Sequence, residues 1–221
     1  MKYRTQSIST SHLESNVVLR NTYALLGLTL LFSAIVAWGT MMLRLPQPGL
    51  LLTLAGFYGL SYLTHRYSHS AAGILCAFAL TGFLGYTLGP IIGMLLASYA
   101  NGYVILGMSL AATGVTFISL SAYVLTTNKD MSYLGGMLFI TSILAMIAAF
   151  ASIILQLPIM GLAVSGLFSL VSSGFILFHT SQIIHGGERN YIVATISLFV
   201  ALYNLFLSLL RIFMVFGGQR D

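Results

Sequence analysis

Two histidines, His65 and His69, stand four residues apart, which is the spacing of two metal ligands on one face of a helix. A protein zinc site usually needs three or four side-chain ligands, and no carboxylate or cysteine stands beside this pair in the sequence. The pattern therefore favours ordinary polar side chains at the end of a helix. We predict no metal site and no cofactor in this chain.

A third histidine, His179, lies within an apolar run and shares a helical face with Ser165, Ser169 and Ser172. An imidazole can change its charge near neutral pH, so this residue could sense or relay protons. A neutral imidazole could equally form a hydrogen bond with a serine of a neighbouring helix. A charged group inside a membrane span costs about 2.5–3.5 kcal/mol, so we expect His179 to face the interior of a bundle.

The last apolar run carries a second stripe of small and polar residues, namely Ser197, Ala201, Asn204, Ser208 and Arg211. We expect the two stripes to face each other at the centre of the bundle. Asn204 is predicted to join helices by a hydrogen bond rather than to bind a ligand. Arg211 lies near the end of its run and is predicted to extend toward the membrane surface. Together with His179, these two residues are the candidates for a pH-sensing or conducting pathway.

Glycines recur at every fourth residue in the third apolar run, at Gly85, Gly89 and Gly93, with Pro90 among them. Such a ridge without side chains lets another helix approach closely. Pro90 cannot donate a helical hydrogen bond and is predicted to kink its helix. The pattern predicts tight packing, and a hinge or broken helix beside a pathway is the alternative.

The four acidic residues, Glu14, Asp130, Glu188 and Asp221, all fall in tails or loops. No pair of carboxylates therefore lies within an apolar run, which excludes an aspartic intramembrane protease. Nucleophile, phosphate-loop, zinc-protease and dinucleotide motifs are absent as well. We predict that the protein is not an enzyme.

Of the 221 residues, 58% are hydrophobic and 6% are charged, whereas about a quarter of an ordinary soluble domain is charged. So few charges cannot cover a globular surface in water, and the lipid bilayer is the surrounding that fits. The net charge of +5 comes from bases scattered singly between apolar runs rather than gathered on one face. This scatter argues against a nucleic-acid-binding protein.

A helix of about 20 apolar residues crosses a bilayer, and polar or Pro- and Gly-containing breaks divide this chain into seven apolar runs. We predict an all-α membrane protein with seven transmembrane helices, the second one short, over residues 23–43, 49–64, 72–97, 103–126, 133–155, 159–183 and 192–216. The connections are too short for a soluble domain, so residues 21–221 are expected to form a single bundle.

The basic residues predict how this bundle is oriented. If seven helices alternate in direction, the side opposite the N-terminus carries Arg44 and Arg220, to which Arg211 near the end of the last run could add. The side of the N-terminus carries Lys2, Arg4, Arg20, Arg66, Lys129 and Arg189. Lys and Arg concentrate on the cytoplasmic side of membrane proteins. We therefore place the N-terminus in the cytoplasm and the C-terminus in the periplasm.

Residues 1–20 precede the first apolar run and are polar and rich in Ser and Thr. They contain too few apolar side chains to fold alone, so a disordered cytoplasmic tail is predicted.

Three stretches resemble the Bax inhibitor 1 family: Thr81–Pro90, His179–Gln182 and Leu198–Phe206. The similarity covers nearly the whole chain from Asn21 onward and is greatest for the proteobacterial branch named as modulators of the membrane protease FtsH. The resemblance implies a seven-helix bundle in the bacterial inner membrane. It also implies two alternative functions.

One of these functions is a pH-sensitive calcium or proton leak, which the family resemblance attributes to two aspartates on the sixth and seventh helices. In this chain His179 stands at the first of these positions and Ala201 at the second. Calcium prefers oxygen ligands, for which imidazole is a poor substitute. The two replacements argue against a calcium leak of the family type, while a proton response of His179 stays open.

The other function is binding to an FtsH-type ATP-dependent protease, whose turnover of other proteins the bound chain would slow. Such a protease starts at loose ends and could engage the tail, which includes Lys2, Arg4 and Glu14. It would then meet a tightly packed bundle that is hard to extract. Our leading hypothesis is therefore an inner-membrane regulator of this protease that is itself a slowly degraded substrate, with the leak channel as the alternative.

Overall fold

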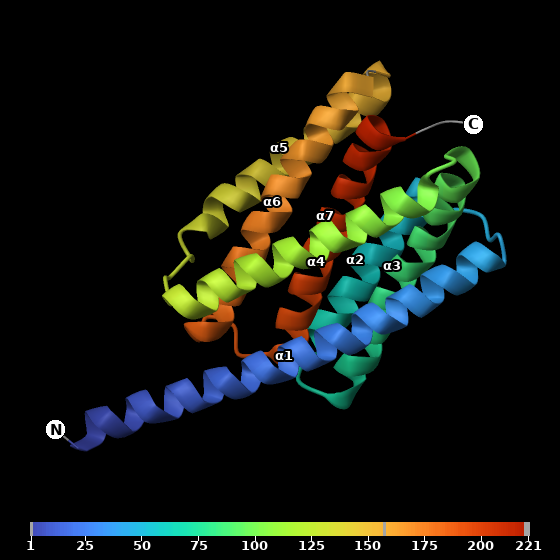
Figure 1. The fold of residues 1–221 in the computed structure, drawn as a ribbon. Helices are drawn as coiled ribbons and strands as arrows, with labels where there is room; N and C mark the ends of the chain where they lie inside the picture. The colour runs from blue at the N-terminus through green and yellow to red at the C-terminus, as the bar shows by residue number, and fades with distance from the viewer. Residues whose placement is uncertain (1, 157, 219–221) are drawn as a thin grey trace. The chain divides into compact units, whose positions relative to one another are not determined.

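The computed structural model describes residues 2–156 and 158–218, and in these residues the chain folds into seven helices (Figure 1). Their bounds are α1 Lys2–Met42, α2 Leu50–Tyr67, α3 Ala71–Ser98, α4 Gly102–Thr127, α5 Leu134–Leu155, α6 Pro158–Ile184 and α7 Tyr191–Gly217. The predicted all-α fold is confirmed. Each helix lies within a few residues of the predicted run, apart from the start of α1.

Six helices of the described chain are long and apolar enough to cross a membrane, namely α3 to α7 and α1 from Asn16 onward. Helix α2 is not among them, because its 18 residues include the polar side chains of Thr64, His65 and Arg66. Large apolar side chains such as Leu31 and Phe139 are exposed on the long helices. Lipid is the surrounding in which such exposed apolar surfaces are stable.

The chain divides into two compact units. The first unit comprises Met1–Ser98 and Gly186–Phe199, and the second comprises Tyr99–His185 and Val200–Asp221. Helix α7 therefore contributes its first turns to the first unit and its later turns to the second.

In the first unit, α3 packs on α1 through glycines. Gly85 faces the backbone oxygen of Ser33, and Gly89 faces the hydroxyl of Thr40, so that a Cβ atom at either glycine would overlap its neighbour. The contacts advance along both helices in the same order, which means that α1 and α3 run in the same direction. Close approach of two backbones is the arrangement that a glycine ridge permits between helices in lipid.

Helix α2 runs back alongside α3 and forms a helical hairpin with it. Gly73, near the start of α3, lies against the carbonyl oxygen of Tyr67 at the end of α2. Further along α3, the Phe83 ring lies against Gly56 of α2. The first three helices therefore alternate in direction, as neighbouring spans joined by short connections do.

The second unit contains another hairpin, formed by α5 and α6. Gly135 faces the ring of Phe178, and Gly174 faces the side chain of Leu138, so the start of α5 lies beside the end of α6. Helix α4 packs on α6 as well. Helix α4 ends at Thr127, and the next residue, Asn128, has a left-handed conformation with φ of 49° that turns the chain out of the helix.

The first helix begins at Lys2, so the structure does not show the disordered segment that the sequence predicts at residues 1–20. Lengthening an existing helix gains a hydrogen bond per residue without a new nucleation step, and no glycine or proline interrupts residues 2–26. Lys2, Arg4 and Glu14 lie in these first turns, and their side chains lie outside the described part of the structure. The boundary between tail and bundle stays a prediction.

Candidate functional site

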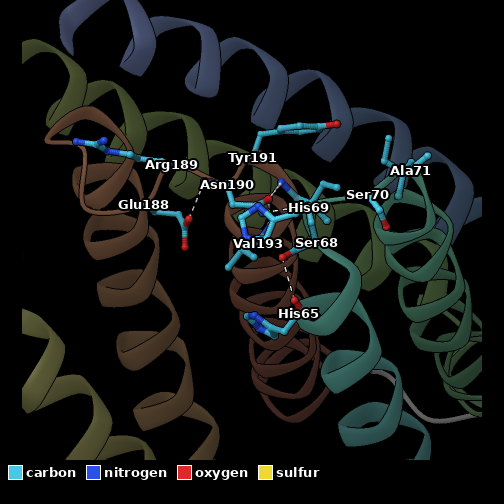
Figure 2. A pocket seen from close by; sticks show the side chains of 12 residues that line it. His65, Ser68, His69, Ser70, Ala71, Glu188, Arg189, Asn190, Tyr191 and Val193 are labelled. Atoms are coloured by element: carbon cyan, nitrogen blue, oxygen red, sulfur yellow. Dashed lines mark hydrogen bonds between the residues drawn. The ribbon is translucent and has the colours of Figure 1, made fainter.

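A pocket of about 880 Å³ lies in the first unit, at the end of α2, the start of α3 and the segment that leads into α7 (Figure 2). Its apolar lining includes Ile74, Ile192 and Val193. Its polar lining comes from the end of α2, the turn between α2 and α3, and the segment before α7: His65, Ser68, His69, Ser70, Glu188, Arg189 and Asn190. The volume lies within the range of about 300–1,000 Å³ that is usual for small-molecule sites.

Asn190 joins the two sides of this pocket. Its side-chain amide donates a hydrogen bond to the backbone oxygen of Ser68 at 2.9 Å. Its side-chain oxygen accepts hydrogen bonds from the backbone nitrogens of Ile192 and Val193, at 2.9 and 3.3 Å, and so caps the first turn of α7. A carboxylate oxygen of Glu188 accepts a hydrogen bond from the backbone nitrogen of Asn190 at 2.7 Å. The segment before α7 is thereby fixed against the turn between α2 and α3.

His65 and His69 lie on one side of the hollow and Glu188 on the other, whereas the Arg189 side chain extends away from them (Figure 2). Neither imidazole has a hydrogen-bond partner among the described residues. The fold thus brings a carboxylate into the same pocket as the histidine pair, although none is near it in the sequence. Even so, no group of three metal-ligating side chains that could hold an ion is found in the described chain.

In the second unit, His179 is half-buried and packs against aromatic rings. Its ring stacks on Phe175 with 5.6 Å between the ring centroids, and the ring of Phe178 meets it edge-on at 5.2 Å. Within the part of the chain that the structure describes, the imidazole has no hydrogen-bond partner. The hydroxyls of Ser165 and Ser169 donate to backbone oxygens of α6 itself. Aromatic rings rather than a serine therefore surround His179.

The candidate residues of α7 differ in exposure. Ala201 is buried, whereas Arg211 is exposed. Asn204 is half-buried, and its backbone oxygen accepts a hydrogen bond from the Ser208 hydroxyl at 2.7 Å. A role for Asn204 and Arg211 in a pathway, together with His179, stays a prediction.

On α3, the closest backbone contacts end before Gly93. A Cβ atom at Gly93 would lie 3.6 Å from the side chain of Met41, which is an ordinary van der Waals distance. Pro90 lies inside α3, and the helix continues beyond it to Ser98. The predicted kink at Pro90 stays a prediction.

A polar cluster that sequence reasoning missed joins the end of α6 to the connection between α4 and α5. The buried hydroxyl of Ser181 accepts a hydrogen bond from the backbone nitrogen of Met131 at 2.8 Å. The side-chain amide of Gln182 donates to the Ser132 hydroxyl at 2.9 Å. The only signal in the sequence is that two polar residues, Ser181 and Gln182, end an apolar run. This signal does not show that their partners are Met131 and Ser132.

Asp130 lies in the same connection and is fully exposed. Hydrogen bonds from the hydroxyl and then the backbone nitrogen of Ser132 hold the pKa of Asp130 below its ordinary value of 3.8. The His185 ring, whose positive form would lower this pKa further, lies 3.2 Å from the backbone oxygen of Asn128. The connection therefore presents an ionised carboxylate at neutral pH.

Comparison with known proteins gives a consistent result. The family described as Bax1-I, Inhibitor of apoptosis-promoting Bax1, matches residues 15–219. The chain is 55% identical over 203 residues, 92% of each protein, to the "Modulator of FtsH protease YccA" of Escherichia coli strain K12. It is equally similar to the "Inner membrane protein YccA" of a second Escherichia coli strain. An uncharacterised protein of Pseudomonas aeruginosa is 50% identical over 99% of this chain and 98% of its own length.

Proposed function

The chain belongs to the family described as Inhibitor of apoptosis-promoting Bax1, and on this basis we propose that it binds an FtsH-type ATP-dependent protease and modulates its activity. One observation carries the proposal: the 55% identity to an Escherichia coli protein named as a modulator of FtsH protease, which extends over 92% of both chains. The family that the sequence motifs indicated is thereby confirmed. The names of these relatives describe modulators and membrane proteins rather than enzymes.

The chain is a multi-pass protein of the bacterial inner membrane, because six helices can cross a bilayer and an Escherichia coli relative is named as an inner membrane protein. In our proposal α2 is a seventh span, which runs back beside α3. Its 18 residues extend about 27 Å at 1.5 Å per residue, close to the hydrocarbon thickness of about 30 Å. The distribution of Lys and Arg supports a cytoplasmic N-terminus.

The proposed mode of modulation is slow extraction from the N-terminal end. Residues 2–20 and the first span form one continuous helix, so a pull on its first turns is transmitted directly to the part of α1 that packs on α3. There the backbone oxygen and the hydroxyl of Ser33 lie against Gly85, so α3 has no side chain between the two helices at that point. A helix held in this way resists removal, and a protease that is occupied with it degrades other proteins more slowly.

Affinity purification of the tagged full-length chain from the inner membrane in mild detergent tests the partner. We expect the FtsH-type protease to co-purify and to be identified by mass spectrometry. An equally abundant multi-pass protein from outside the family is the control. A protease that is found in neither the eluate nor the products of cross-linking in intact membranes would contradict the proposal.

A further inference from the structure

The pocket of the first unit lies where three helices end. Helix α2 ends at Tyr67, α3 begins at Ala71 and α7 begins at Tyr191, and the pocket lies among these ends. Both α3 and α7 are long and apolar enough to span the membrane. The ends of spanning helices lie at the level of the lipid head groups, about 15 Å from the bilayer centre. The head groups of membrane lipids can therefore reach this pocket directly.

Apart from Arg189, whose side chain extends away from the histidines and Glu188 (Figure 2), the side chains of the polar lining fall into two classes. Asn190, Ser68 and Ser70 are engaged within the protein, since each donates a hydrogen bond to a backbone oxygen. The imidazoles of His65 and His69 have no partner in the described residues. Glu188 uses one carboxylate oxygen to accept a hydrogen bond from the backbone of Asn190, and its other oxygen is left to accept from a ligand.

These free groups face the hollow from opposite sides (Figure 2). A carboxylate accepts hydrogen bonds from a primary ammonium group, and an imidazole N–H donates to a phosphate oxygen. A simple anion would be repelled by Glu188, and a simple cation would find no second acid in the pocket lining. A ligand that carries both charges on a short apolar link matches both sides, with Ile74 and Val193 beside the link.

We propose that this pocket binds a zwitterion that carries a primary ammonium and a phosphate group, as in the head group of phosphatidylethanolamine. The ammonium group lies at Glu188, and the phosphate lies at His65 and His69. The volume of about 880 Å³ holds such a head group together with part of the glycerol backbone. The same chemistry occurs in a membrane lipid and in free phosphoethanolamine, and the position at the helix ends favours the lipid.

Lipid binding to the purified, delipidated full chain tests the proposal by native mass spectrometry. Phosphatidylethanolamine, phosphatidylcholine and phosphatidylglycerol with identical acyl chains are compared. The quaternary ammonium of the second lipid cannot donate a hydrogen bond, and the third lipid has no ammonium group. We expect phosphatidylethanolamine to bind about tenfold more tightly than either, which is the effect of one charge-assisted hydrogen bond. Equal affinity for the three lipids overturns the proposal.

Variants test which side of the pocket binds the ammonium group and which side binds the phosphate. Glu188→Gln removes the charge but keeps an oxygen that can accept from the backbone of Asn190, so we expect folding to persist and the preference over phosphatidylglycerol to be lost. His65→Ala with His69→Ala removes two exposed rings and should weaken binding of all three lipids about tenfold. Arg66→Ala is the matched control, because Arg66 is an exposed cation beside the pocket that does not line it. A loss in Arg66→Ala equal to that in the histidine variant overturns the proposal.

Free phosphoethanolamine distinguishes the two sources of the ligand. If it displaces the bound lipid and Glu188→Gln abolishes the displacement, the head-group chemistry alone is sufficient. If the lipid binds selectively and free phosphoethanolamine does not displace it, the ligand is the membrane lipid. If neither binds selectively, the pocket has no such ligand. None of these results depends on a protease, so the outcome is independent of the proposed modulation.

Discussion

Gly89 on α3 lies so close to Thr40 on α1 that a Cβ atom at the glycine would overlap the threonine hydroxyl. Thr40 is buried, and its hydroxyl donates a hydrogen bond to the backbone oxygen of Ala37 at 3.0 Å. The polar group of Thr40 is therefore satisfied within α1, and the two helices meet without a side chain on α3 between them. In lipid, where helices gain little from the hydrophobic effect, such close packing is a main source of helix association.

Gly89→Ala should loosen this contact. The added methyl group meets Thr40 and the α1 backbone, which cannot move like a flexible side chain, and overpacking of this kind costs about 1–3 kcal/mol. We expect a lower thermal unfolding midpoint for the variant in detergent. Gly93→Ala is the matched control on the same helix, because its Cβ atom would make only an ordinary contact with Met41. Equal midpoints for the two variants would show that the glycine contact adds no stability.

Ser181→Ala should release the connection between α4 and α5. The substitution leaves the backbone nitrogen of Met131 without its acceptor in a buried position, which costs about 1–3 kcal/mol. We expect amide hydrogen exchange at residues 129–132 to become faster. Ser169→Ala serves as the control, because that hydroxyl donates only to a backbone oxygen of its own helix. Unchanged exchange in Ser181→Ala would mean that other contacts hold the connection.

Much of the fold could be predicted from the sequence, because the solvent imposes it. A bilayer requires long apolar helices, and the breaks between apolar runs are chemically distinct. For this reason the predicted run 192–216 and the observed α7, Tyr191–Gly217, nearly coincide. Helix α1 begins earlier than the predicted apolar run for a different reason. Composition predicts whether a segment can fold alone, whereas residues 2–20 extend a helix that already exists.

The candidate site could be predicted only in part. The spacing of the histidine pair is visible in the sequence. Glu188 and Asn190 lie in the same pocket because Asn190 is hydrogen-bonded to the backbone oxygen of Ser68, which no local pattern indicates. The aromatic neighbour of His179 could have been predicted from the sequence. Phe175 stands four residues before it, a spacing that places two side chains in contact on one helical face. The serines of that face drew attention to hydrogen bonding, whereas the neighbouring Phe175 ring decides what His179 contacts.

The alternative function leads to a prediction about ion flux. Neither His179 nor buried Ala201 offers the carboxylate oxygens that calcium prefers, so we expect no calcium flux through the purified chain in liposomes between pH 6 and 8. Dye-loaded liposomes with and without the protein measure this flux, and an ionophore gives the maximum signal. A protein-dependent flux that is abolished by His179→Ala would favour the channel instead.

The first turns of α1 lead to a prediction about the chain's own degradation. Deletion of residues 2–15 removes the end from which the protease is proposed to start, so we expect a longer half-life of the chain in cells that contain the protease. A variant with Lys2, Arg4 and Glu14 replaced by Gln keeps the length and should be degraded like the original chain. An unchanged half-life after the deletion would contradict engagement at this end.

The most direct test of the account measures the turnover of a second protein. A purified FtsH-type protease is reconstituted in liposomes with a membrane-protein substrate, and the chain is added in increasing amounts, with an unrelated multi-pass protein as the control. We predict that the half-life of the substrate lengthens in proportion to the added chain and not to the control. A substrate half-life that is the same at every ratio would contradict the proposed modulation.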